Sequence, residues 1–175
     1  MSATVRPDNL KAALDAKIAA AMAYLAELRE AEQPRVTPHL NSRELVGTLM
    51  GYARSVQTIA SAFGRAQSGE LQHNAWYEQW KKVLSEADRR LWLELGDERG
   101  HAQGAALVDV ETLVASDPSV AGPPSQPRAH ADVRKRVCRF AAFPERPASD
   151  VCSDMLLLAR RFAGEFLRDH ARFLR

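Results

Sequence analysis

The feature that most constrains the fold of this chain is the helical spacing of its apolar residues. In the first such segment they recur every three or four positions, which places them on one stripe of a helix. Pro7 precedes the segment and Pro34 follows it, and proline cannot continue the hydrogen-bond ladder of a helix. We therefore expect a helix from Asp8 or Asn9 to about Glu32. Its stripe comprises Leu10, Leu14, Ile18, Ala21, Leu25 and Leu28.

A second stripe of the same spacing predicts a helix that begins near Ser42. The Ser42 hydroxyl can cap this helix, and Glu44 lies in the first turn, where an acidic side chain interacts favourably with the helix dipole. Gly64 and the polar run 67–69 mark its end. The stripe comprises Leu45, Leu49, Tyr52, Val56, Ile59 and Phe63.

Two shorter helical segments follow. The first starts near His73 and places aromatic residues on one face. The second starts after Ser85, which with Asp88 resembles a capping box, and continues through Leu95 to an expected C-cap at Gly96. The aromatic residues of the first segment are Trp76, Tyr77 and Trp80.

The helical pattern breaks after residue 96. Apolar residues near 107–110 and 133–143 alternate imperfectly and predict two short strands in a β-hairpin. The loop between them, 115–132, holds four prolines and should be exposed and mobile. The last helix is expected from Ser149 or Asp150 to the C-terminus. Its stripe comprises Val151, Met155, Leu158, Phe162, Phe166 and Phe173.

These elements predict a mainly all-α fold, a four- to five-helix bundle with a short β-hairpin or irregular insertion before the last helix. A chain of 175 residues is most simply one domain, 1–175, with a flexible N-terminus at 1–8. The 24 basic and 22 acidic residues nearly balance, which predicts no diffuse attraction to nucleic acid or acidic membranes. With two cysteines, no signal peptide and no apolar run of roughly 20 residues, we expect a cytoplasmic chain without a membrane span.

Familiar catalytic and metal motifs are missing from the sequence. The five histidines are scattered, none pairs with another at i, i+4, and the cysteines lack C-x-x-C spacing, so we expect no metal and no cofactor. The phosphate-binding and nucleophile-elbow motifs are also absent. Cys152, near a helix start, could be a nucleophile, but its spacing from Val151 and Met155 favours a buried structural thiol.

The densest basic cluster comprises Arg134, Lys135, Arg136 and Arg139. One hypothesis is that these cations bind the phosphates of RNA. The other is that they form the solvated edge of a strand, where charge prevents pairing with other chains. Few aromatic residues stand nearby to stack on bases, which favours the second hypothesis.

A second group of ionisable residues occupies the junction 97–104. Arg99 could stabilise a phosphate in a transition state, His101 could transfer a proton near neutral pH, and Glu98 could assist them. The alternative is a polar helix exit in which Gly100 and Gly104 are turn residues. Composition alone favours the helix exit.

Three short patches accompany this order of elements. They are Tyr52–Ala53–Arg54–Ser55–Val56, Trp76–Tyr77 and Phe140–Ala141–Ala142–Phe143–Pro144. With the arginine-containing junction and the final helix, the chain resembles the HEPN domains (higher eukaryotes and prokaryotes nucleotide-binding), particularly bacterial stand-alone members. The resemblance extends from about Leu10 to the C-terminus.

The resemblance implies a homodimer, because HEPN proteins are commonly dimeric. Many are metal-independent ribonucleases of toxin–antitoxin or antiphage systems, with an arginine followed by a histidine after four to six intervening residues. Arg99 matches in position, but 104–106 are glycine and two alanines, and His101 follows after one residue. Residues two apart diverge on a helix, so a site built on Arg99 and His101 requires a non-helical junction.

Three functions follow. The first is a HEPN-like, dimerising binding or regulatory protein of a toxin–antitoxin or defence-type system, without the usual catalytic motif, which binds an antitoxin, a complex subunit or RNA. The second is a metal-independent endoribonuclease that uses Arg99, His101 and Glu98. The third is an unrelated α-helical accessory subunit. The lack of an intact catalytic motif favours the first.

Overall fold

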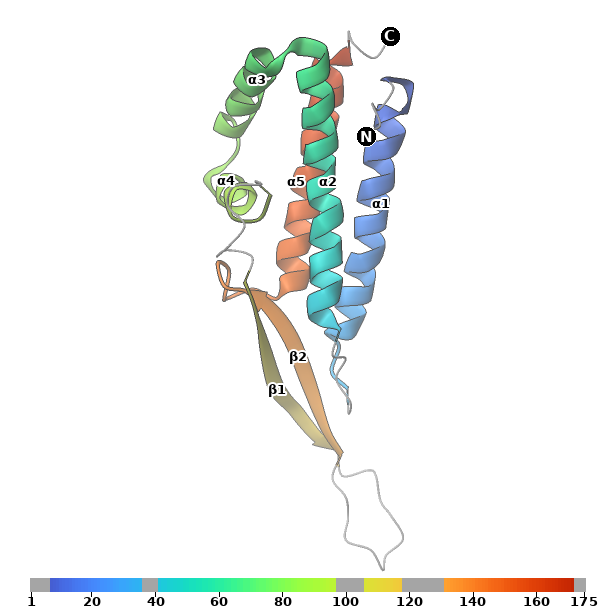
Figure 1. Ribbon diagram of the computed structural model, residues 1–175. Coiled ribbons are helices and arrows are strands. Elements are labelled where there is room, and N and C mark those ends of the chain that lie inside the picture. The colour runs from blue at the N-terminus through green and yellow to red at the C-terminus, as the bar shows by residue number, and fades with distance from the viewer. Residues whose placement is uncertain (1–6, 36–40, 97–105, 118–130, 172–175) are drawn as a thin grey trace, which may run out of the picture.

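The computed structural model describes residues 7–35, 41–96, 106–117 and 131–171. Three long helices, α1 (Pro7–Ala31), α2 (Ser42–Ser68) and α5 (Ala148–Asp169), pack along one another as a bundle (Figure 1). This arrangement confirms the predicted mainly helical fold with a hairpin before the last helix.

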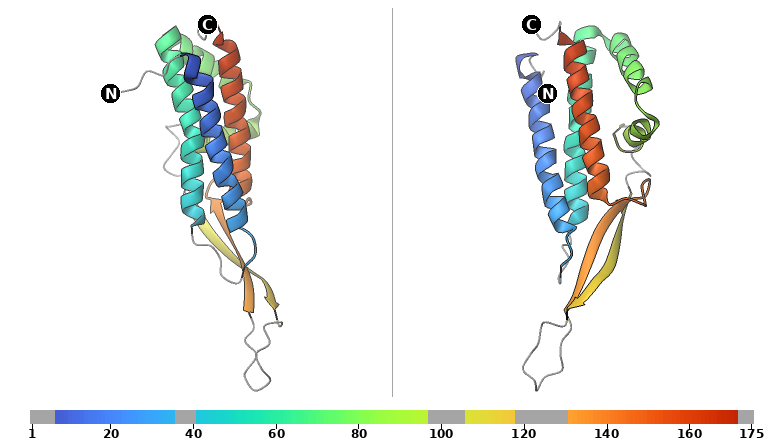
Figure 2. Two further views of the ribbon diagram at one scale, coloured as in Figure 1. Left: turned by 90° about the vertical axis from the view of Figure 1, so that its right-hand side faces the viewer. Right: turned by 180° about the vertical axis from the view of Figure 1, so that it is seen from behind.

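The shorter elements form an arm and a hairpin beside this bundle. The arm consists of α3 (Glu70–Lys82), α4 (Glu86–Leu91) and the π-helical turn η1 (Trp92–Gly96), and it folds back along the long helices. The antiparallel strands β1 (Leu107–Asp117) and β2 (Ala131–Phe140) project from one end of the bundle (Figures 1 and 2).

The predicted apolar stripes form the core. Every member of the first stripe is buried on α1, and on α5 the buried stripe runs from Val151 to Phe166. In α2, Tyr52 and Ile59 are only partly buried, because they lie at the edge of its stripe. Phe173, expected to extend the stripe of α5, lies outside the described residues.

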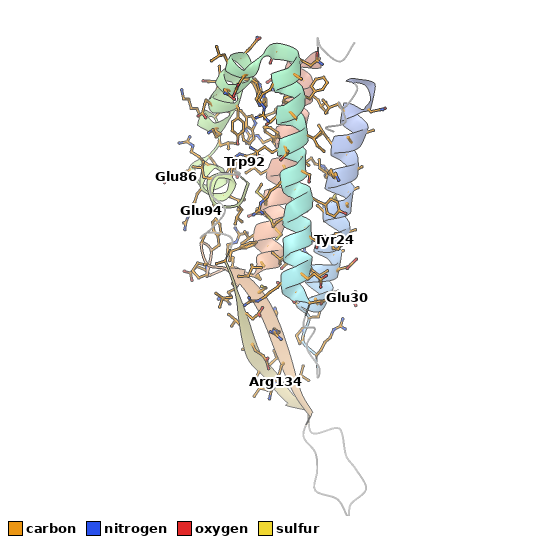
Figure 3. All side chains as sticks on the ribbon, in the orientation of Figure 1. Tyr24, Glu30, Glu86, Trp92, Glu94 and Arg134 are labelled. Atoms are coloured by element: carbon orange, nitrogen blue, oxygen red, sulfur yellow. The ribbon has the colours of Figure 1, made fainter. Side chains whose placement is uncertain are left out.

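An aromatic cluster attaches the arm to α5. The rings of Trp80 and Trp92 pack on Phe162, with centroid distances of 4.9 and 5.2 Å. The Tyr77 hydroxyl accepts hydrogen bonds from Trp92 Nε1 at 2.7 Å and from Gln57 Nε2 at 2.9 Å. Figure 3 shows Trp92 on the side of the arm that is nearest the long helices. These contacts join α2, α3, η1 and α5, and the two hydrogen bonds give partners to the side-chain donors of Trp92 and Gln57.

Helix ends followed the sequence pattern only in part. The Ser85 hydroxyl accepts from Asp88 N at 3.1 Å, as the predicted capping box requires. Ser42 is not a cap: Asn41 holds that position, and the Ser42 side chain is buried in the first turn. Gly96 ends no α-helix but packs within η1 against Met155 and Trp92.

The hairpin is longer than expected. Leu107 lies opposite Phe140 and Asp109 opposite Cys138, and the two β2 residues are buried in the core, so the root of the hairpin is anchored in the bundle. Both ends of the predicted 115–132 loop are strand, and the remainder lies outside the described residues. Among the helices of the described residues, none combines the length and apolar character needed to cross a bilayer.

Two glycines in the same helix provide a test of the packing between α2, α3 and α5. A Cβ at Gly64 would collide with His73 Nδ1 and approach the Phe166 ring to 3.1 Å, whereas a Cβ at Gly47 would meet nothing within 4 Å. We expect Gly64→Ala to lower the free energy of unfolding by about 1–3 kcal/mol through overpacking. We expect Gly47→Ala to raise it by about 0.5–1 kcal/mol, because alanine favours the helix.

Urea unfolding followed by circular dichroism measures both variants. Equal effects of the two substitutions would contradict the close approach of α3 and α5 to Gly64.

Candidate functional site

The predicted catalytic residues Glu98, Arg99 and His101 fall within 97–105, outside the described residues. A catalytic role for them stays a prediction.

The structure separates the four cations of the basic cluster. Residues that alternate along a strand point to opposite faces, so Arg134 and Arg136 share one face of β2, while Lys135 and Arg139 lie on the other. Figure 3 shows Arg134 on the hairpin, away from the centre of the bundle. At most two of the four cations can therefore meet one ligand on one face.

Acidic residues of β1 neutralise the two arginines on the bundle-facing side of the hairpin. Arg134 pairs with Glu111 at 2.9 Å, and Arg136 pairs with Asp109 at 3.1 Å. Arg43 at the start of α2 also binds Asp109, at 2.9 Å. Burial alone would raise the pKa of Asp109, but the hydrogen bonds from Arg43 and Arg136 outweigh it and hold that pKa below its usual value.

A buried polar contact joins α1 to α5 next to the hairpin root. The Ser149 hydroxyl donates to Oε2 of Glu32, and Oε1 of this buried carboxyl has no hydrogen-bond partner among the described residues. Burial raises the pKa of Glu32 more than the hydrogen bonds from Ser149 lower it. The hydrogen bond from Ser149 to Glu32 links the end of α1 to the start of α5. Within the described ranges, Glu32 belongs to no cluster of three side chains that could bind a metal ion.

Both cysteines are buried near this contact. Burial raises the pKa of Cys138 to about 11, and it raises the pKa of Cys152 further. Their thiols stay protonated at neutral pH and are poor nucleophiles. Cys152 is buried, as its spacing from Val151 and Met155 predicted.

The buried His73 is equally unsuited to acid–base chemistry near pH 7. It stacks among Trp76, Tyr77 and Phe166 at the far end of the bundle. Burial, assisted by the charges of Arg65 and His170, lowers the pKa of His73 to about 4. The imidazole is therefore neutral at physiological pH and serves as a packing group.

The outer face of α5 carries an apolar surface that the sequence pattern did not reveal. Leu157 is 63% exposed and Met22 of α1 is 48% exposed. They line a groove of about 160 Å³ between α1 and α5, whose rim includes Arg29 and Arg160. Figure 2 (right) shows α5 nearest the viewer, between α1 on one side and the arm on the other.

Leu157 also lines a second groove, of about 160 Å³, where α4 meets α5. Its other lining residues include Asp88, Asp154 and Arg161. Leu157 is thus a ridge between two grooves. The sequence held a signal for it, because Leu157 lies beside the buried stripe, with Asp154 and Arg160 three positions away on either side.

Comparisons of the chain with protein-family models, curated proteins and solved structures find no match.

The buried Glu32 predicts a pH dependence of stability. Because its pKa is higher in the folded than in the unfolded chain, the folded state holds more protons above pH 4.5 and stability falls as pH rises through this window. Glu32→Gln removes the titration but keeps an oxygen that can accept from Ser149. We expect its free energy of unfolding, relative to wild type, to rise from pH 4.5 until the folded-state pKa is passed.

Urea denaturation at intervals between pH 4 and 8 measures this difference. Glu27→Gln, at an exposed position on α1, is the control for the loss of one carboxylate. A profile of Glu32→Gln parallel to wild type would contradict the raised pKa.

Proposed function

We propose that this chain is a HEPN-like, dimerising binding or regulatory protein, acting in the cytoplasm within a toxin–antitoxin or defence-type system. The observation that carries the proposal is the outer face of α5, with Leu157 exposed between two grooves. Large exposed apolar side chains gathered around grooves are typical of protein–protein interfaces. A second copy of the chain is the occupant that its pattern of charges favours.

The residues around Leu157 are complementary to themselves. When two α5 helices cross antiparallel about a two-fold axis at Leu157, a residue three positions before it faces a residue three positions after it on the partner. This arrangement places Asp154 opposite the partner's Arg160, and the two-fold axis generates a second, equivalent pair. Asp154 already accepts from Arg146 at 2.7 Å through Oδ2, which leaves Oδ1 for a second donor.

Arg160 is suited to such a pairing. Its guanidinium contacts Met22 Sδ at 4.0 Å, and it has no carboxylate partner among the described residues. By contrast, the neighbouring Arg161 pairs with Glu165 at 2.9 Å. An arginine held over an apolar groove without an acidic partner supports an intermolecular role.

The apolar ridge gives the first test. We expect Leu157→Lys to weaken dimerisation at least tenfold, since burying an unpaired ammonium at the centre of an interface costs more than about 1.4 kcal/mol. Leu71→Lys, at a more exposed leucine on α3, is the control and should leave the dimer intact. Sedimentation equilibrium measures both dissociation constants.

A charge exchange gives the second test of the same interface. Arg160→Glu would place two carboxylates opposite each other and should weaken the dimer about tenfold. The double variant Asp154→Lys with Arg160→Glu recreates opposite charges in reversed order and should restore dimerisation to within about threefold of wild type. A wild-type chain that stays monomeric at 100 µM, on the order of the weakest stable dimers, would refute the proposed dimer.

The ribonuclease alternative is decided separately, with the dimeric protein and RNA without added metal. We expect the RNA to remain intact. Cleavage that is lost in both Arg99→Ala and His101→Ala would contradict the proposed function and establish the enzyme instead.

A further inference from the structure

The two edges of the hairpin differ in their backbone pairing. The edge of β2 is occupied at Arg134, whose N–H and C=O exchange hydrogen bonds with Arg35 at 2.9 Å each. The outer edge of β1 pairs with no other strand in the described part of the chain, where the sheet has only β1 and β2. In Figure 1, β1 lies on the side of the hairpin away from α1.

The register identifies the backbone groups on this edge. Arg134 turns its backbone away from β1 toward Arg35, and Arg134 lies opposite Leu113. In an antiparallel pair such residues form a non-hydrogen-bonded pair, so Leu113 also turns its backbone outward. Non-hydrogen-bonded and hydrogen-bonded pairs then alternate along β1. This order makes Ala106 and Ala141 a hydrogen-bonded pair, which agrees with the bond from Ala141 N to Ala106 O at 2.8 Å. The N–H and C=O groups that point outward are therefore those of Leu107, Asp109, Glu111 and Leu113.

This edge lacks several of the features that usually prevent strand pairing. From 107 to 113 it contains no lysine and no proline, and the β-bulge comes only after Leu113. Val108 is 53% exposed and Leu113 is 58% exposed. An open edge flanked by exposed apolar side chains is a template for another strand.

The charged residues of β1 indicate what kind of strand could pair with its outer edge. Asp109 and Glu111 are its charged residues between 107 and 113, and they share one face, while Val108 and Val110 lie on the other. Both carboxylates already pair with arginines, so a strand on this edge would extend that ladder of alternating charge by placing basic residues opposite them, with apolar residues between. On the other side of β1, Arg134 and Arg136 of β2 pair with the same two carboxylates.

A second copy of the chain fits this edge poorly. Pairing two β1 strands about Val110 would set Asp109 of one copy opposite Glu111 of the other, and like charges directly opposite destabilise a sheet. The edge of β2 in a second copy is already occupied by Arg35. The occupant favoured by these contacts is a strand from a different protein.

We propose that the outer edge of β1, residues 107–113, binds an extended segment of a partner protein in which basic and apolar residues alternate. The segment adds a third strand to the hairpin. This site is independent of the α5 surface, so it can be tested in the monomeric Leu157→Lys variant as well as in wild type.

The probe is a seven-residue peptide of alternating valine and lysine with blocked ends. On addition of the peptide, amide hydrogen exchange at Asp109 and Glu111 should slow about fivefold or more, because their N–H groups gain partners. Exchange at Val108 and Val110 should change little, since these N–H groups already bond to β2. Protection without this alternation, or no protection at millimolar peptide, would overturn the proposal.

Two peptide controls test the register and the charge. N-methylation of alternate residues gives two isomers, and only the isomer that keeps its edge-facing N–H groups should bind. Replacing each lysine of the peptide with glutamate should weaken binding about tenfold or more. Equal binding of the two methylated isomers would refute strand addition.

On the protein, Glu111→Lys should weaken peptide binding about tenfold, whereas Glu70→Lys on α3 should not alter it. If Glu111→Lys also perturbs the hairpin, Glu111→Gln serves as a second variant, with circular dichroism to verify the fold. Protection of Asp109 and Glu111 that depends on protein concentration without peptide would assign the edge to a second copy and overturn the choice of partner.

Discussion

The burial of Phe162, midway along α5, is the contact on which the rest of the structure depends. Trp80 and Trp92 pack on its ring from the arm, while α1 and α2 cover other sides of the same helix. With its apolar stripe enclosed in this way, α5 keeps one outward face. Leu157 lies on that face, so the packing of the core determines which part of α5 can meet another protein.

Near the root of the hairpin, polar contacts hold neighbouring elements together, as aromatic packing does around Phe162. Ser149 and Glu32 join the ends of α5 and α1, and Asp109 ties β1 to Arg43 of α2. The root of the hairpin is thereby anchored, while the part of the hairpin beyond it projects from the end of the bundle. The α5 face and the β1 edge are separate surfaces, so the proposed dimer would leave the β1 edge of each copy open.

The paired charges of the hairpin explain why a basic cluster in the sequence is a poor guide to nucleic-acid binding here. Arg134 and Arg136 each face a carboxylate of β1, and an exposed pair such as Arg134–Glu111 contributes only about 0–1 kcal/mol to stability. Their larger consequence is for recognition. The charge that a ligand would meet on the bundle-facing side is nearly cancelled, because each of these carboxylates pairs with an arginine.

The sequence by itself determined the helical stripes, the position of the hairpin and the burial of Cys152, because these follow from local periodicity and composition. It could not determine that Ser42 is buried, that Gly96 packs on Met155, or that Leu157 is exposed, since each depends on a neighbouring element distant in the chain. The partners of Arg134 and Arg136 likewise depended on strand register. Tertiary structure decided which charges are cancelled and which apolar side chains remain outside, because only packing brings distant residues together.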